Sequence, residues 1–235
     1  AQRAARTRTL KLPRALLARS SAPLSPCRRY FALAGTSLRW YDTEKDCHGA
    51  KPSCLGEIEC VDLSPSDDGA VITITGAAGF LGQRMMRLLA ARGERLVLTD
   101  MHPLPTPPPP NATVLTGPLE QLLPQAITED TTAVVHLAAV VSAGAEADFD
   151  LGYAVNVTTL QAVLERCREV GSCPKLLFTS SLAVFGAIDV ATDASACQPS
   201  SSYGTQKALG ELLVNDYSRK GFVDGRTLRL PTASQ

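Results

Sequence analysis

The chain has 235 residues, 45% of them hydrophobic and 20% charged, and a formal net charge of zero at pH 7. This composition is typical of a globular protein built around one main core, and it disfavours two full domains. The longest apolar run, residues 133–143, is far shorter than the roughly 20 residues that cross a bilayer, so we expect no membrane association.

The charges are distributed unevenly along the chain. Residues 1–40 contain nine Lys or Arg and no acidic residue, which leaves 14 of the 23 basic residues, against 23 acidic ones, in the rest of the sequence. An Arg-rich, acid-free start is typical of a mitochondrial transit peptide, and a disordered basic tail explains it equally well. We therefore expect residues 1–68 to form a basic, disordered or irregular N-terminal extension. We expect a cytoplasmic location, with the mitochondrion as the alternative, and no nucleic-acid partner, because no groove-reading pattern accompanies the basic residues.

Seven cysteines are scattered along the chain without a repeating pattern. An odd number in a chain of this size favours reduced thiols in an intracellular protein over a disulfide framework. Four potential metal ligands, namely Cys47, His48, Cys54 and Cys60, lack the paired C-x2-C spacing of common zinc sites. We expect no metal site there and interpret this region as a polar linker.

From Gly69 onward, strand-like and helix-like periodicities alternate. Strands are expected at 70–75, 95–99, 112–116, 133–138, 175–180 and 226–230, and helices at 80–91, 118–127, 151–170 and 203–219. The strands are nearly continuous apolar runs separated by helices, which indicates a parallel sheet covered on both faces. The predicted fold class is therefore α/β, with a Rossmann-like doubly wound parallel sheet in an NAD-binding domain over residues 69–235.

The sequence TGAAGFLG (75–82) lies between the first of these strands and the first helix. In that position Gly76 permits a tight turn, Gly79 lets a pyrophosphate approach the backbone, and Gly82 lets helix and strand pack closely. The helix N-terminus offers unpaired N–H groups to phosphate oxygens. Asp100 ends the second strand, where its carboxylate can accept hydrogen bonds from a ribose 2′-hydroxyl and would repel a 2′-phosphate. These features predict NAD as the cofactor, in preference to NADP.

The spacing T-G-x-x-G-x-x-G resembles that of the extended short-chain dehydrogenase/reductase family, also called the NAD-dependent epimerase/dehydratase family. Tyr203 and Lys207 in SSYGTQKALGELL match the Y-x-x-x-K motif of this family, and Ser181 in FTSSLAVFG falls where the family has its catalytic serine. The resemblance implies that these three residues are catalytic, and that Tyr203 and Lys207 also contact the cofactor. It further implies a cofactor site made of Gly76, Gly79, Phe80, Leu81, Gly82, Asp100, Leu137, Ala138, Ala139 and Asn156, the last of which braces the site from a helix.

The spacing of Tyr203 and Lys207 also has a direct chemical meaning. Residues i and i+4 share one face of a helix, so the ammonium group of Lys207 lies near the phenol of Tyr203. A free tyrosine has a pKa of about 10, and a base that works near neutrality needs a pKa lower by roughly 2–3. We expect Lys207 and the positively charged nicotinamide ring to lower it, and Ser181 to hold the substrate hydroxyl whose proton Tyr203 accepts. Ser180 is an adjacent hydroxyl that can either assist or, as a strand-end residue, bond to backbone groups, and we interpret His136 as a strand residue rather than a second base.

Three longer stretches, 140–156, 180–186 and 201–232, resemble family members that oxidise the 2-hydroxyl of a small sugar acid, such as D-erythronate, with NAD. The resemblance therefore implies an NAD-dependent dehydrogenase of carbohydrate metabolism, acting on a small-molecule substrate. A nucleotide-sugar epimerase or dehydratase with the same triad, and a non-catalytic NAD-binding protein, stay open as alternatives.

The family pattern differs from this sequence at two places. Pro118 stands where the family usually has an aspartate that contacts adenine, and the sequence ends at LRLPTASQ, soon after the sixth predicted strand. Because the family continues there into a substrate-binding region, we expect a truncated C-terminal substrate region and poor turnover by these 235 residues. Many relatives pair through helices that correspond to 151–170 and 203–219, which makes a homodimer the candidate assembly.

Overall fold

The computed structural model describes residues 30–34, 37–41, 56–59, 70–188, 191 and 195–230. Its main element is a six-stranded sheet in the order β6-β5-β4-β7-β8-β9, in which every pair of neighbouring strands is parallel. The strands are β4 (Val71–Thr75), β5 (Arg95–Asp100), β6 (Ala112–Thr116), β7 (Thr131–His136), β8 (Lys175–Ser181) and β9 (Asp224–Leu230). The strand order reverses between β4 and β7, and doubly wound sheets bind ligands at the carboxyl ends of the strands at such a point.

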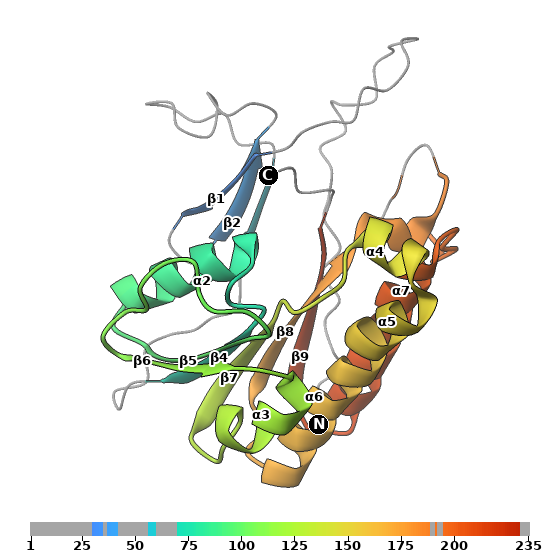
Figure 1. Ribbon diagram of the computed structural model, residues 1–235. Coiled ribbons are helices and arrows are strands. Elements are labelled where there is room, and N and C mark those ends of the chain that lie inside the picture. The colour runs from blue at the N-terminus through green and yellow to red at the C-terminus, as the bar shows by residue number, and fades with distance from the viewer. Residues whose placement is uncertain are drawn as a thin grey trace.

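Helices cover both faces of this sheet (Figure 1). One face packs against α2 (Phe80–Ala91), and the other against α3 (Leu119–Ala126), α6 (Thr159–Val170) and α7 (Ser202–Arg219). The shorter helical elements are α4 (Ser142–Ala147), α5 (Phe149–Tyr153), the π-helix η2 (Ala154–Thr158) and the 3-10 helix η3 (Leu182–Phe185). The predicted Rossmann-like sheet is confirmed.

Alternate residues of the same strands fill the two cores. In β4, Ile72 and Ile74 are fully buried with the residues of α2, whereas the hydroxyl of Thr73 between them donates to the carbonyl of Ala126 at the end of α3. Phe178 of β8 is buried in the second core, with α6 and α7. Because successive side chains point to opposite faces, a strand between two helical layers must be apolar on both, and this produces the continuous apolar runs in the sequence.

Most predicted bounds lie within one or two residues of the observed ones, and two of the differences have a visible structural form. β7 ends at His136 rather than at residue 138: the N–H of Leu137 still donates to the carbonyl of Thr75 in the neighbouring strand, but that of Ala138 donates to the Thr75 hydroxyl instead. The helix predicted over 151–170 begins earlier and consists of α5, the π-helix η2 and α6. The short helix α4 was missed, since its six residues, SAGAEA, have no apolar periodicity.

Part of the predicted N-terminal extension also forms strands. β1 (Tyr30–Ala34), β2 (Ser37–Tyr41) and β3 (Gly56–Glu59) pair as a three-stranded antiparallel sheet, so these residues are not irregular. The boundary at Gly69 lies outside the described residues, as do Cys47, His48, Cys54 and Cys60. The domain division and the expectation about metal therefore stay predictions.

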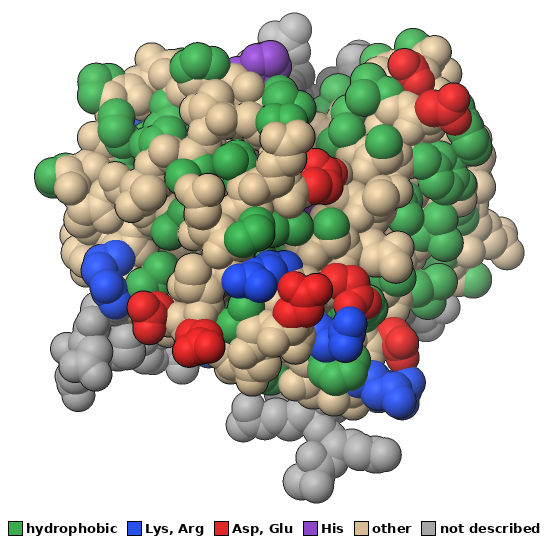
Figure 2. Space-filling view, turned by 60° about the horizontal axis from the view of Figure 1, so that its bottom comes forward, with side chains coloured by type: hydrophobic (Ala, Val, Ile, Leu, Met, Phe, Trp, Pro, Cys, Tyr) green, Lys and Arg blue, Asp and Glu red, His purple; other side chains and the backbone are tan. Residues whose placement is uncertain are grey.

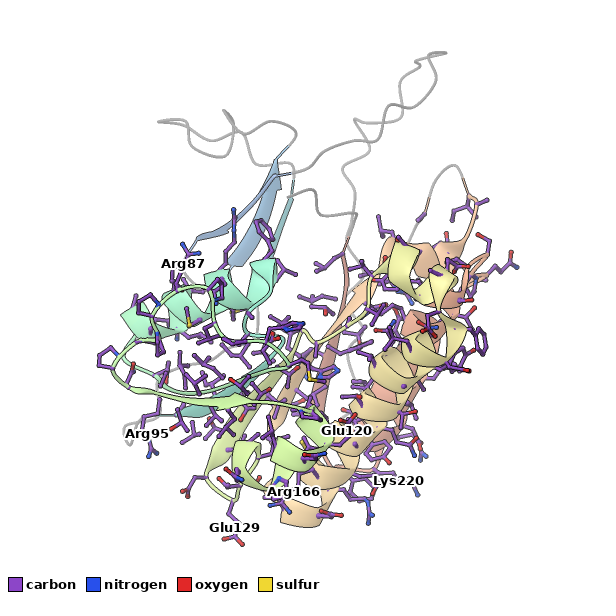
Figure 3. All side chains as sticks on the ribbon, in the orientation of Figure 1. Arg87, Arg95, Glu120, Glu129, Arg166 and Lys220 are labelled. Carbon is purple, nitrogen blue, oxygen red and sulfur yellow. The ribbon has the colours of Figure 1, made fainter. Side chains whose placement is uncertain are left out.

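The two ends of the sheet differ in character. Glu129, Arg166 and Lys220 lie at the end of the molecule where β7, β8 and β9 begin (Figure 3). Figure 2, which brings that end forward, shows acidic and basic side chains mixed with one another. The predicted site residues lie at the opposite end, where the strands finish.

Among the helices of the described residues, none is both long and apolar enough to cross a bilayer.

Candidate cofactor and catalytic site

The glycine turn joins β4 to α2 and is packed against backbone on two sides. Gly76 has a φ of +70°, and a Cβ there would lie 2.7 Å from the backbone nitrogen of Ala138, in the segment after β7. A Cβ on Gly82 would lie 2.2 Å from the carbonyl oxygen of Gly76. Both positions therefore require glycine, one for the turn and its close neighbour and one for the packing of the helix. Gly79 is exposed, and its N–H donates to the carbonyl of Gly76.

The first turn of α2 is open to an anion. Gly79 precedes the helix without a side-chain cap, and the first turn contains no acidic residue. Phe80 and Leu81 begin the helix as half-buried side chains, and the guanidinium of Arg84 stacks 4.3 Å from the centre of the Phe80 ring. Because the unpaired N–H groups of a helix start carry partial positive charge, this turn fits the pyrophosphate of a dinucleotide.

Asp100 lies beside the turn, at the end of β5. One carboxylate oxygen accepts a hydrogen bond from the N–H of Ala78 at 2.9 Å, and the other accepts one from the N–H of His102 at 3.0 Å. The carboxylate thus ties the glycine turn to β5, which the sequence did not predict. Each carboxylate oxygen has two lone pairs, so Asp100 can still accept from a ribose hydroxyl. Its half-buried negative charge disfavours a 2′-phosphate, and these residues therefore fit NAD.

The segment after β7 forms the second wall of the turn. It contains the half-buried residues Leu137, Ala138 and Ala139, and Asn156 of η2 holds it in place. The amide of Asn156 accepts from the N–H of Val140 and donates to its carbonyl, both at 2.9 Å, and it donates to the side chain of Gln206 at 2.7 Å. Asn156 is 1% exposed and its polar atoms are engaged inside the protein, so its link to the cofactor site is indirect.

His136 is buried at the end of β7, between the two halves of the site. Its Nδ1 forms a hydrogen bond with the hydroxyl of Thr75 at 2.9 Å, and its ring stacks on Phe178. Burial, followed by the charge of Lys207, lowers the pKa of His136 to about 3. An imidazole with such a low pKa is a weak base, which agrees with its interpretation as a strand residue.

Ser181, Tyr203 and Lys207 meet at the carboxyl end of β8. The hydroxyl of Ser181, the last residue of the strand, faces the phenol of Tyr203 on α7 closely enough to lower the pKa of that phenol. The ammonium of Lys207, one turn further along α7, donates to the carbonyl of Thr179 at 2.9 Å and lies 5.7 Å from the centre of the Tyr203 ring. One strand and one helix therefore bring the three predicted residues together.

The pKa values of this triad differ from the expectation. Burial raises the pKa of Tyr203, and the hydrogen bond with Ser181 opposes that effect. Burial lowers the pKa of Lys207 to about 8. The ammonium of Lys207 faces the carbonyl of Thr179 and the ring of Phe178, 4.9 Å away, rather than the phenol oxygen. In this arrangement Lys207 by itself does not lower the pKa of Tyr203. The expected lowering also included the positive charge of the nicotinamide ring.

Sequence reasoning missed an ion pair beside the triad. Arg229 donates to both carboxylate oxygens of Glu211, at 2.8 and 2.6 Å, and the two side chains are only 10% and 11% exposed. The carboxylate also accepts from the hydroxyl of Ser180 at 2.6 Å. The four-residue step from Lys207 to Glu211 was a usable signal, since it places both on one helix face. No local pattern connects Arg229 to them.

Comparisons with known proteins agree with this geometry. The family model described as "NAD dependent epimerase/dehydratase family" matches residues 72–234, a range that includes the glycine turn, Asp100 and the triad. The chain is 52% identical over 178 residues to D-erythronate dehydrogenase from Cupriavidus necator. This alignment covers 69% of this chain and 55% of that protein. The chain is 44% identical over 171 residues to D-erythronate dehydrogenase from Haemophilus influenzae, in an alignment that covers 68% and 54%. The chain thus spans about half the length of the curated relatives it matches.

A solved structure shares the fold. A short-chain dehydrogenase/reductase superfamily protein from Agrobacterium tumefaciens, solved with bound NAD, superposes with a TM-score of 0.60 and 32% sequence identity. The match covers 68% of this chain and 48% of that protein.

Proposed function

The chain belongs to the NAD-dependent epimerase/dehydratase family, and from this premise we propose that it oxidises the 2-hydroxyl group of a small sugar acid, such as D-erythronate, with NAD. The observation that carries the proposal is the convergence of Ser181, Tyr203 and Lys207 at the sheet edge that also holds the glycine turn. The 52% and 44% identity to proteins named D-erythronate dehydrogenase supports the substrate class.

The triad residues have separate roles in this reaction. Ser181 donates a hydrogen bond to the substrate oxygen and orients the hydroxyl group, and Tyr203, as the phenolate, accepts the hydroxyl proton at its phenolic oxygen. Lys207, whose ammonium lies 5.7 Å from the centre of the Tyr203 ring, supplies a positive charge on the same helix face. When bound, NAD supplies the acceptor for the hydride that leaves the hydroxyl-bearing carbon. The products are a 2-keto acid, the reduced cofactor and one proton.

The cofactor contacts are divided between two segments of the chain. The glycine turn and the start of α2 would hold the pyrophosphate, Asp100 would bind the ribose of the adenosine half, and the segment after β7 would contact the nicotinamide half. Tyr203 and Lys207 would also contact the nicotinamide half, and Asn156 supports the segment after β7 through Val140. The proposed contact residues are Gly76, Gly79, Phe80, Leu81, Gly82, Asp100, Leu137, Ala138, Ala139, Tyr203 and Lys207.

Net formation of NADH tests the proposal. The purified protein is mixed with NAD and either D-erythronate, its stereoisomers or UDP-linked sugars, while NADH absorbance is recorded and the sugar products are separated. NADH formed only with a sugar acid supports the dehydrogenase. Conversion of a UDP-sugar without net NADH would replace it with the epimerase, which the family description favours as the second candidate, because an epimerase returns the hydride in each cycle. Binding of NAD without any turnover would leave a non-catalytic NAD-binding protein.

We also propose that the protein forms a homodimer through α5, α6 and α7. Phe149 and Leu151 on α5, and Leu212 on α7, are 59%, 46% and 65% exposed, and α5 and α7 are in contact. Large apolar side chains that gather on neighbouring helices favour a protein contact. Sedimentation analysis of the Leu212→Glu variant tests this, since a dimer that uses this face should dissociate and a monomer should be unaffected.

The domain division and the location are proposals as well. Residues 69–235 are assigned to the NAD-binding domain, and residues 1–68 to an extension. The thiols of Cys167, Cys173 and Cys197 are free, which favours an intracellular location; we propose the cytoplasm, with the mitochondrion as the alternative because of the basic first 40 residues. Microscopy of a C-terminal fluorescent fusion distinguishes the two.

A further inference from the structure

The helix α7 presents a row of three functional side chains to the end of β8. Tyr203, Lys207 and Glu211 follow one another at four-residue intervals, so they share one face of the helix. Each of them contacts a different member of residues 179–181. The first two contacts belong to the catalytic triad, and the third joins Glu211 to the hydroxyl of Ser180. The row therefore extends one helical turn beyond the triad.

Arg229, on the neighbouring strand β9, holds the carboxylate of Glu211 in its contact with Ser180. It lies directly opposite Ser180 in the register between β8 and β9, and its guanidinium binds both oxygens of Glu211. The same guanidinium lies 4.7 Å from the centre of the Phe185 ring in η3, the element that follows β8. It also donates to the Sγ of Cys197, at 3.3 Å, in the segment that leads to α7. One guanidinium thus contacts α7, the element η3 that follows β8, and the segment that leads into α7.

Stability alone does not account for this ion pair. Both charged side chains are nearly buried, and Ser180 is 3% exposed. A buried ion pair adds little net stability compared with an apolar pair of the same volume, because the cost of desolvation offsets the attraction. A bidentate arginine–carboxylate contact instead restricts the relative orientation of the two groups. The pair is therefore suited to holding a helix and two strands in one geometry.

We infer that Ser180, Glu211 and Arg229 form a positioning network that holds the catalytic face of α7 against the end of β8 and so sets the contact between Ser181 and Tyr203. None of the three is a catalytic residue. The hydroxyl of Ser180 donates to Glu211 and the residue is 3% exposed, which favours a positioning role over the assistance at the substrate that the sequence left open. The inference rests on the proposed dehydrogenase function for its kinetic consequences, but its geometric consequence is independent of any substrate.

The Glu211→Gln variant tests the geometric consequence, with Asp216→Asn as the matched control. Asp216 lies on the same helix and pairs with Arg219, but these side chains are 59% and 61% exposed. The titration of Tyr203 is followed by 13C NMR of labelled tyrosine, and Tyr203→Phe identifies its signal among the five tyrosines.

We expect the titration midpoint of Tyr203 to shift in Glu211→Gln, and to rise in Ser180→Ala, which alters no charge and weakens the contact with Ser181 that lowers this pKa. The control should leave the midpoint unchanged. A folded Glu211→Gln variant with an unchanged midpoint, or a Ser180→Ala variant with an unchanged or lowered one, overturns the inference. Should that variant fail to fold, Ser180→Ala provides the same comparison, because it keeps the ion pair and removes only its link to β8.

Kinetics separate positioning from a purely structural role. In Glu211→Gln we expect kcat to fall by about 10-fold to 10²-fold, with KM changed by less than about twofold, as misplacement of a reacting group predicts.

The double variant Glu211→Leu with Arg229→Met replaces the pair by apolar side chains and should regain the melting temperature while kcat and the Tyr203 midpoint stay altered. Full recovery of kcat and of the midpoint in the double variant would show that the pair only stabilises the fold, and would overturn the inference. If the Tyr203 midpoint moves as expected but the wild-type protein oxidises no sugar acid, the proposed function fails and the positioning network stands.

Discussion

The cofactor half of this site is built mainly from backbone groups, whereas the catalytic half is built from side chains. The glycine turn is formed by backbone, and it depends on the absence of side chains at Gly76 and Gly82. The catalytic end of β8 is formed by buried side chains, of which Lys207, Glu211 and Arg229 carry charge. Backbone N–H groups bind phosphate without titrating, whereas proton transfer needs side chains whose pKa values the protein can shift. The two halves should therefore respond differently to substitution and to pH.

The largest effect is expected from Tyr203→Phe in the catalytic half. Removal of the proton acceptor should lower kcat by about 10²-fold or more, and NAD affinity should be largely kept because the glycine turn is untouched. Steady-state kinetics and calorimetric titration with NAD measure the two quantities. Tyr217→Phe on the same helix is the control, since its hydroxyl contacts Glu165 and lies outside the site. Near-normal turnover by Tyr203→Phe would disprove the proposed base.

In the cofactor half, the corresponding change is Gly82→Ala. Its Cβ would meet the carbonyl oxygen of Gly76 at 2.2 Å, so the turn must shift. We expect the free energy of unfolding to fall by about 2–3 kcal/mol and NAD binding to weaken. Gly93→Ala is the control: its φ of +81° makes alanine unfavourable by about 1 kcal/mol, but no atom lies within 4 Å of the added Cβ. Urea denaturation of both variants tests this, and an equal loss in the two would contradict it.

The buried His136 between the halves predicts a dependence of stability on pH. The folded pKa of His136 is lowered to about 3 from 6.5, so the unfolded chain takes up a proton below about pH 6.5 that the folded chain does not. This group should therefore reduce the free energy of unfolding by about 1.4 kcal/mol for each pH unit between these values as the pH falls. His136→Gln lacks this proton uptake, and its unfolding free energy should fall less steeply between pH 6.5 and 5. Parallel slopes for the variant and the wild type would show that His136 is protonated in the folded protein.

The smallest effect is expected at Asp100, whose side chain belongs to the cofactor half of the site. NAD should raise the melting temperature of the wild-type protein more than NADP does. In Asp100→Asn the ratio of NAD affinity to NADP affinity should fall by about tenfold, since the amide retains the volume and an acceptor of the carboxylate but not its charge. Asp100→Ala also removes the contact with the N–H of Ala78, so it should weaken both cofactors. Thermal shift and calorimetry with the two cofactors provide the measurement. A preference unchanged in Asp100→Asn would place this carboxylate away from the ribose.

Local sequence patterns predicted the parts of the site that lie within a few residues of one another. The turn TGAAGFLG carries its spacing in one continuous stretch, and Tyr203 and Lys207 share a helix face through a four-residue step. Apolar runs between helices likewise predicted the parallel sheet, because strands buried on both faces have to be apolar at nearly every position. The sequence by itself therefore determined the fold class, and it predicted the position of the phosphate turn and, through the family resemblance, the three residues of the triad.

Only the tertiary structure decided the features that depend on residues far apart in the chain. The end of β7 at His136 follows from hydrogen bonds with Thr75, 61 residues or more away, and the second role of Asp100 follows from the amide of Ala78, 22 residues away. The ion pair of Glu211 with Arg229, and the direction of the Lys207 ammonium toward the carbonyl of Thr179, also join separate elements. A pKa or a hydrogen-bond partner depends on the neighbours that packing brings within a few ångströms, and no spacing along the chain specifies those neighbours.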